Sequence, residues 1–154
     1  MTLLALTLAV ALVQPPPAAG AAQSTTTAPT MRTLDKGDHS NVDDAAQLVA
    51  KSAQEWQQLW QKHTPDRPRP TVDFSKEMVV GVFLGSRPTA GYTLEIVSAT
   101  QDGGKLMVRY REASPPRDAM TAQVLTSPYH IVAVPFFPGE VKFEKAGAAG
   151  RAGK

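Results

Sequence analysis

The sequence contains no cysteine. This absence excludes disulfides, thiolate metal sites, iron–sulfur clusters and a cysteine nucleophile. It also excludes the bacterial lipoprotein anchor, which needs a cysteine at the cleavage point. The chain of 154 residues leaves room for one domain, and its 42% hydrophobic residues are enough for a real core.

The chain also has little excess of one charge sign over the other. The formal net charge is +2, and acidic and basic residues are mixed along the chain. A dedicated nucleic-acid binder would instead concentrate Lys and Arg on one face. We therefore expect no nucleic-acid partner, and only weak attraction to anionic surfaces.

Sequence motifs of catalysis and metal binding are missing as well. The chain has no G-x-S-x-G, no P-loop and no G-x-G-x-x-G. His39, His63 and His130 lack H-x-x-x-H and H-E-x-x-H spacing, so we expect no metal site and no cofactor. We interpret the protein as not an enzyme. The alternative is a small active site assembled in space from His130, Asp73 or Glu112.

The first residues form an apolar, uncharged run, which is followed by prolines and small residues. This pattern is typical of the hydrophobic and cleavage regions of a secretory signal. No Lys or Arg precedes the run, so a disordered Ala/Pro-rich leader is the alternative. We predict an exported protein (periplasmic, cell-surface or secreted) with no membrane span after signal removal. The predicted divisions are a signal (1–22), a linker (23–30), a single domain (31–145) and a disordered tail (146–154).

One helix is strongly indicated at residues 53–63. Ser52 and Glu55 form a capping box, in which the Glu side chain would return to the Ser52 amide. An apolar face follows at helical spacing and predicts core packing. Its residues are Trp56, Leu59 and Trp60. His63 lies in the last turn, where a partly positive imidazole would suit the helix dipole.

The remaining pattern predicts β-strands. Residues 78–84 are apolar on both faces, as expected of a central strand covered on two sides. Asp102-Gly103-Gly104 predicts a hairpin turn closed by Gln101 and Lys105. Further strands are expected before the helix (31–40, and a returning strand at 45–51) and later in the chain, with a short strand at 121–125, an apolar strand at 129–134 and an alternating last strand at 141–144. We predict an α+β fold, mainly antiparallel β (sandwich-like or a curled sheet), with one amphipathic α-helix packed on it.

The connection at residues 85–91, which leads to a strand expected from Tyr92, is unusual, because seven residues are many for a loop between two strands of a hairpin. Pro88 stiffens it, and Gly85 and Gly91 permit unusual backbone angles at its ends. Tyr92 adds the kind of side chain that interfaces favour. The alternative is a structural turn with Tyr92 pointing into the core.

Several motifs resemble those of the PrcB family, in its C-terminal domain. They are Val72-Asp73-Phe74-Ser75, Glu77-Met78-Val79-Val80, Leu84-Gly85-Ser86-Arg87-Pro88-Thr89-Ala90-Gly91-Tyr92 and Thr126-Ser127-Pro128-Tyr129. The family takes its name from a lipoprotein that associates with, and stabilises, a surface subtilisin-like protease. The resemblance implies an exported, non-catalytic subunit with a protein partner, such as a secreted protease. The expected contacts are Arg87, Pro88, Thr89, Ala90, Gly91, Tyr92, Ser127, Pro128 and Tyr129.

The same loop is similar to the N-P-T-T-G-Y/F loop of chagasin-type cysteine protease inhibitors. Arg87 replaces the Asn and Ala90 replaces a Thr, and the R-P-W motif of those inhibitors is absent. The alternative function is therefore that of a chagasin-type protease inhibitor, with residues 87–92 as the inhibitory loop.

Overall fold

The computed structural model describes residues 30–147, which form seven strands and one helix. In chain order they are β1 (Arg32–Gly37), β2 (Ala46–Ala50), α1 (Ala53–His63), β3 (Glu77–Phe83), β4 (Thr93–Asp102), β5 (Lys105–Ala113), β6 (Tyr129–Pro135) and β7 (Glu140–Lys145). The predicted signal and parts of the predicted linker and tail lie outside the described residues.

The strands form two sheets. The first has the order β1-β6-β3-β2 and is antiparallel throughout, and the second has the order β4-β5-β7. β4 and β5 are an antiparallel hairpin, whereas β5 and β7 are parallel. The predicted α+β, mainly antiparallel fold is confirmed.

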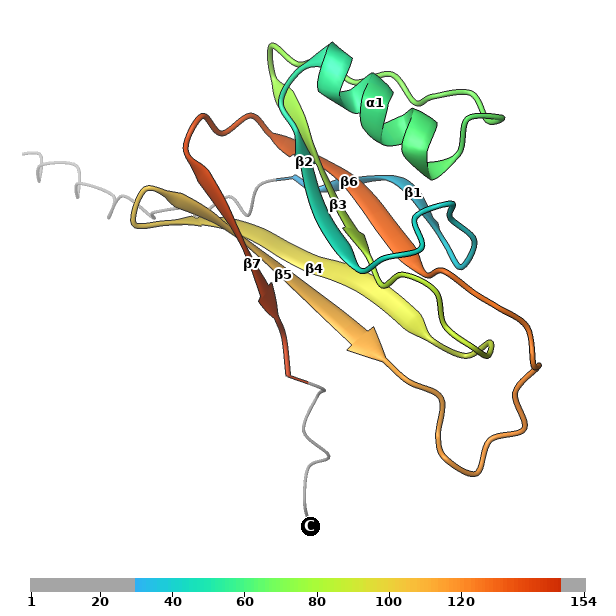
Figure 1. Ribbon diagram of the computed structural model, residues 1–154. Helices are drawn as coiled ribbons and strands as arrows, with labels where there is room; N and C mark the ends of the chain where they lie inside the picture. The colour runs from blue at the N-terminus through green and yellow to red at the C-terminus, as the bar shows by residue number, and fades with distance from the viewer. Residues whose placement is uncertain (1–29, 148–154) are drawn as a thin grey trace, which may run out of the picture.

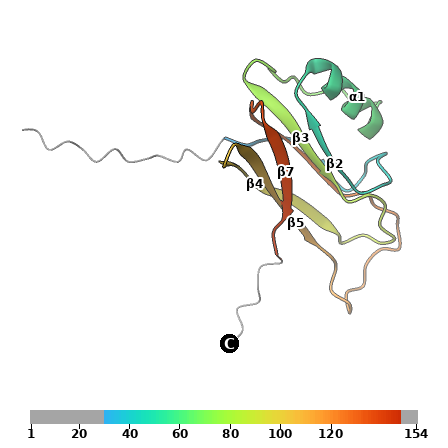
Figure 2. The same ribbon diagram turned by 60° about the vertical axis from the view of Figure 1, so that its left-hand side comes forward.

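The molecule has three layers (Figures 1 and 2). α1 covers one face of the four-stranded sheet, and the three-stranded sheet covers the other. β3 is therefore buried on both faces: Val80 and Val82 pack toward the second sheet, while Val79 and Phe83 pack toward the helix. This confirms the expectation of a doubly covered central strand.

The helix begins and ends where the sequence predicts. The Ser52 hydroxyl accepts the Glu55 amide at 3.2 Å, but the Glu55 carboxylate accepts from the Lys51 amide at 2.7 Å rather than from the Ser52 amide. The two indoles lie edge to face and are buried. Trp56 Nε1 donates to the Pro70 carbonyl and Trp60 Nε1 to the Arg67 carbonyl, which ties the proline-rich connection down over the helix.

Three expectations about the strands differ from the structure. β1 and β2 do not pair, because they lie at opposite edges of the four-stranded sheet. Asp102, rather than Gln101, pairs with Lys105, so Gly103 and Gly104 alone make the turn, both with positive φ. No strand forms at residues 121–125, where an isolated bridge between Arg87 and Thr126 is the nearest pairing.

His130 joins the two sheets. This β6 side chain is 3% exposed; its Nδ1 accepts the Ile96 amide of β4 at 2.8 Å, and its Nε2 lies 2.9 Å from the Thr33 hydroxyl. Since Nδ1 accepts, the ring carries its hydrogen on Nε2 and donates to Thr33. Burial lowers the pKa of His130 to about 4, with the Lys36 charge adding to the effect and Glu95 opposing it.

No helix in the described part of the chain is long and apolar enough to cross a membrane.

Candidate functional site

The loop between β3 and β4 is held by backbone hydrogen bonds along its length. Arg87 and Thr126 exchange amide-to-carbonyl bonds of 2.6 and 2.9 Å. Further along, the Ala90 amide donates to the Ala122 carbonyl at 3.0 Å, and the Thr126 hydroxyl donates to the Thr89 carbonyl at 2.9 Å. The loop and residues 121–126 thus form one pinned unit, so the loop loses little entropy if a partner binds it.

Glycine is required at the two ends of this loop. Gly85 has φ +73°, and a Cβ there would lie 2.6 Å from the Asp43 carbonyl oxygen and 2.7 Å from the Ala45 nitrogen. Gly91 has φ +92°, and its Cβ would lie 2.9 Å from Pro115. Any other residue would be strained at either position, so both glycines fix the path of the loop.

The loop exposes both polar and apolar residues. Ser86 and Pro88 are exposed, while Arg87 and Tyr92 are partly exposed. The Arg87 guanidinium carbon lies 5.6 Å from the centre of the Tyr92 ring, and Tyr92 packs against the core between the sheets. The Tyr92 ring therefore packs under the Arg87 guanidinium and helps to fix its position.

The connection between β5 and β6 adds an apolar surface that the sequence reading missed. Residues 114–128 contain no strand or helix. Among them Met120, Leu125 and Val124 are 104%, 73% and 51% exposed. Large apolar side chains that gather on one exposed segment are typical of interaction surfaces, and long irregular connections of this kind are commonly functional. We call residues 86–92 and 114–126 together the loop surface.

The Ser127-Pro128-Tyr129 turn lies mostly beneath this surface. The Ser127 amide donates to the Asp38 carbonyl at 2.7 Å, and the Pro128 carbonyl accepts the Leu84 amide at 2.9 Å. Pro128 and Tyr129 are buried, so only Ser127 is partly accessible. The turn holds the loop surface in place from the interior side.

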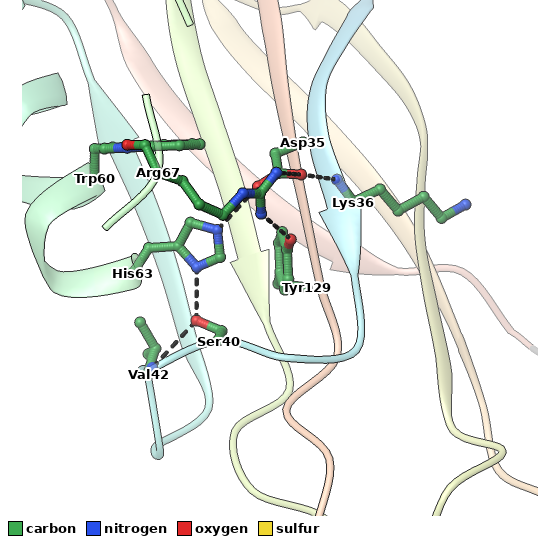
Figure 3. Close-up of polar contacts among 8 residues, drawn as sticks. All are labelled: Asp35, Lys36, Ser40, Val42, Trp60, His63, Arg67 and Tyr129. Atoms are coloured by element: carbon green, nitrogen blue, oxygen red, sulfur yellow. Dashed lines mark hydrogen bonds and ion pairs between the residues drawn. The ribbon is translucent and has the colours of Figure 1, made fainter. Parts of the chain in front are cut away.

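A second cluster lies on the helix side of the four-stranded sheet (Figure 3). His63 Nδ1 is 2.8 Å from the Ser40 hydroxyl, and His63 Nε2 is 3.2 Å from the Asp35 carboxylate. Arg67 binds both Asp35 oxygens, at 2.9 and 3.2 Å, and its Nη1 reaches the Tyr129 hydroxyl at 3.4 Å. We call these five residues the Asp35 cluster. Its Asp-His-Ser order has the composition of a nucleophilic triad.

The environment of the cluster is that of a structural network. His63 is 0% exposed, with its ring 4.2 Å from that of Tyr129 and 5.3 Å from that of Trp60. Ser40 donates to His63 and accepts the Val42 amide at 3.1 Å, so both roles of its hydroxyl are taken within the fold.

The expectation that the His63 imidazole is partly positive is wrong. Burial lowers the pKa of His63 more than the Asp35 bond raises it, so the ring is neutral. Burial alone would raise the pKa of Asp35, but hydrogen bonds from His63 and Arg67 hold it below its ordinary value. The cluster thus fastens α1 and the chain after it to β1 and β6.

The remaining catalytic candidates have separate partners. His130 bonds Thr33 and Ile96, Asp73 accepts the amide and hydroxyl of Ser75, and Glu112 pairs with Lys145 at 2.9 Å. Within residues 30–147 no group of three or more His, Asp or Glu side chains is placed to hold a metal ion.

Comparison with known proteins gives one result. Residues 78–135 match the model of the PrcB C-terminal family. The resemblance to the PrcB family is confirmed. No curated protein and no solved structure matches the chain.

The PrcB region begins in β3 and ends with β6. It includes the whole loop surface, but of the Asp35 cluster it contains only Tyr129. The PrcB family implies association in a protein complex and a domain that is not of a catalytic kind. The part of the fold that the family match covers is therefore the part that presents the loop surface.

Proposed function

We propose that this chain is an exported, non-catalytic accessory protein that associates with a secreted or surface protease and stabilises it. The observation that carries the proposal is the loop surface, in which the pinned loop with Arg87 lies beside the exposed apolar side chains Met120 and Leu125. The PrcB match, which spans this surface, supports a partner of the protease-complex type.

The contact would combine two kinds of interaction. Met120 and Leu125 would lose water when a partner covers them, which is the main source of affinity at such patches. Arg87 would add a directional, charged hydrogen-bond donor that its stacking on Tyr92 already orients. Because backbone bonds already fix the loop, little ordering would oppose binding.

The decisive experiment is capture from exported proteins of the organism that encodes the chain. Immobilised wild type is compared with Arg87→Ala/Tyr92→Ala and with the control Arg69→Ala, whose exposed guanidinium lies outside the loop surface. We expect wild type and control to recover a protease identified by mass spectrometry, and the double variant to lose it. Circular dichroism checks that the variant is folded. Recovery of the same protease by a folded double variant would show that the loop is not the contact.

The purified protease then separates stabilisation from inhibition. With our protein added, we expect a longer half-life of the protease at elevated temperature and undiminished cleavage of a peptide substrate. Loss of cleavage would instead favour the chagasin-type inhibitor. The same assay with a papain-like protease tests that alternative directly.

A further inference from the structure

The two sheets expose four edge strands, which differ in how they are protected. β1, β2, β4 and β7 are the edges. β1 and β4 each carry charged residues and a break in register, and β7 alternates charges along its length. Charges and bulges of this kind prevent an edge from pairing with another chain.

β2 lacks these devices. Its sequence is Ala46-Gln47-Leu48-Val49-Ala50, without charge or proline, and its register with β3 is continuous. Gln47 is exposed, and three of the other four residues are partly exposed. Of the four edges in the described part of the chain, β2 is the one that is open to pairing.

A hollow lies on each side of β2. The first, of about 220 Å3, is formed between the two sheets, and its lining includes Gln47, Tyr110 and Arg87. The second, of about 270 Å3, is formed between β2 and α1, and its lining includes Leu48 and Leu59. Because successive side chains of a strand point to opposite faces, a strand added to β2 would direct alternate residues into the two hollows.

The charges of the first hollow indicate what it would hold. None of the ion pairs within residues 30–147 uses Arg87, whereas the other charged lining residue, Glu112, is paired with Lys145 at 2.9 Å. The Gln47 amide and Tyr110 hydroxyl, which bond each other at 3.2 Å, are further polar groups of the lining. A carboxylate is the group that would best match Arg87 here.

We propose that β2 binds an extended segment of a partner protein by β-strand addition, with an Asp or Glu side chain of that segment placed against Arg87. The main chain of the segment would bond the free edge of β2, and an apolar side chain next to the acid would enter the hollow beside α1. The proposal goes beyond the loop surface, with which it shares only Arg87, and its test does not need the native partner.

The test is selection of short peptides from a random displayed library against the intact chain, followed by amide chemical-shift mapping. We expect the selected peptides to share β-branched residues and one acid, and to shift the amides of β2. Replacing that acid by its amide should weaken binding to wild type about tenfold, but have little effect on Arg87→Gln. Arg69→Gln, as the control, should behave like wild type.

Two proline variants test the edge itself. Neighbouring residues of a strand direct their amides to opposite sides, so one of Gln47→Pro and Leu48→Pro leaves the ladder to β3 intact and blocks the free edge. The variant that remains folded should lose the peptides. Undiminished binding to it, or shifts confined to the loop surface, would overturn the β2 proposal and leave the loop interface standing.

Discussion

The Asp35 cluster and the loop surface use their side chains in opposite ways. In the cluster, reactive side-chain types are bonded to one another: His63 is fully buried, and both of its ring nitrogens have a partner. The loop surface contains no catalytic pair. Its large apolar side chains Met120 and Leu125 are nevertheless exposed to water rather than buried in the core. The difference teaches that residue composition alone does not locate function here. Exposure does, because the loop surface, unlike the Asp35 cluster, has interactions still to make.

The largest expected effect is on the cluster. His63→Ala removes a buried ring and takes one hydrogen bond each from the Ser40 hydroxyl and the Asp35 carboxylate, so it should lower the free energy of unfolding by about 4 kcal/mol. Urea denaturation measures this. His39→Ala, at an exposed histidine, should change stability by less than ~0.5 kcal/mol. A His63→Ala value close to that of His39→Ala would mean that the cluster does not hold the fold together.

The next effect concerns pH. The unfolded His130 takes up a proton below its ordinary pKa of 6.5, whereas the folded ring does so only at about 4. Stability should therefore be complete above 6.5 and fall as the pH drops toward 4, by about 3 kcal/mol in total. His63, whose pKa burial also lowers, adds a loss of the same sign.

His130→Asn isolates the contribution of His130. The side-chain oxygen of the introduced Asn can accept the Ile96 amide but does not titrate. The free energy of unfolding of the variant should therefore depend less on pH between 6.5 and about 4. A variant profile as steep as that of wild type would show that His130 is not the main titrating group.

A smaller effect is expected for Ser40→Ala. The variant loses the hydroxyl that bonds His63 and the Val42 amide, which should cost about 1.5 kcal/mol. We expect wild type and variant to hydrolyse an activated ester equally, at the background rate. If wild type shows an esterase activity that Ser40→Ala lacks, the cluster is catalytic. The contrast between a structural Asp35 cluster and a functional loop surface would then be wrong.

The smallest effect on stability is expected at the loop surface. Leu125→Ser should change the free energy of unfolding by less than ~0.5 kcal/mol, because the side chain is 73% exposed. Binding to the captured protease should nevertheless fall about tenfold, because the partner loses an apolar contact. Gln123→Ser, at an exposed neighbour, should leave both quantities unchanged. Titration calorimetry and thermal unfolding measure them.

Much of the fold was predictable because its signals are local. The Ser52 cap and the tryptophan spacing locate α1, and the glycine pair locates the β4–β5 turn. The pairing partners of β1 and β2 were not predictable, since nothing in either strand specifies which distant strand it joins. The same limit hid the partners of His63 and His130, which come from other elements.

The candidate functional site also has a part that the sequence predicted and a part that it did not. The loop itself was recognisable from Pro88 and its flanking glycines. Its attachment to residues 121–126 was not, because that segment pairs only through an isolated bridge and has no strand pattern. The exposure of Met120 and Leu125 was also hidden, since apolar residues in a sequence are by default expected in the core.

The pairing of β1 with β6 has a consequence for the order in which the chain folds. Thr33 and His130, which meet in this pair, are 97 residues apart. β1 has no strand to join until nearly the whole domain has been synthesised, and closing so large a loop is slow. The newly made chain therefore stays open for longer than one built from neighbouring hairpins. If it is exported as we propose, this delay would help it to cross the membrane unfolded and to complete its sheets on the far side.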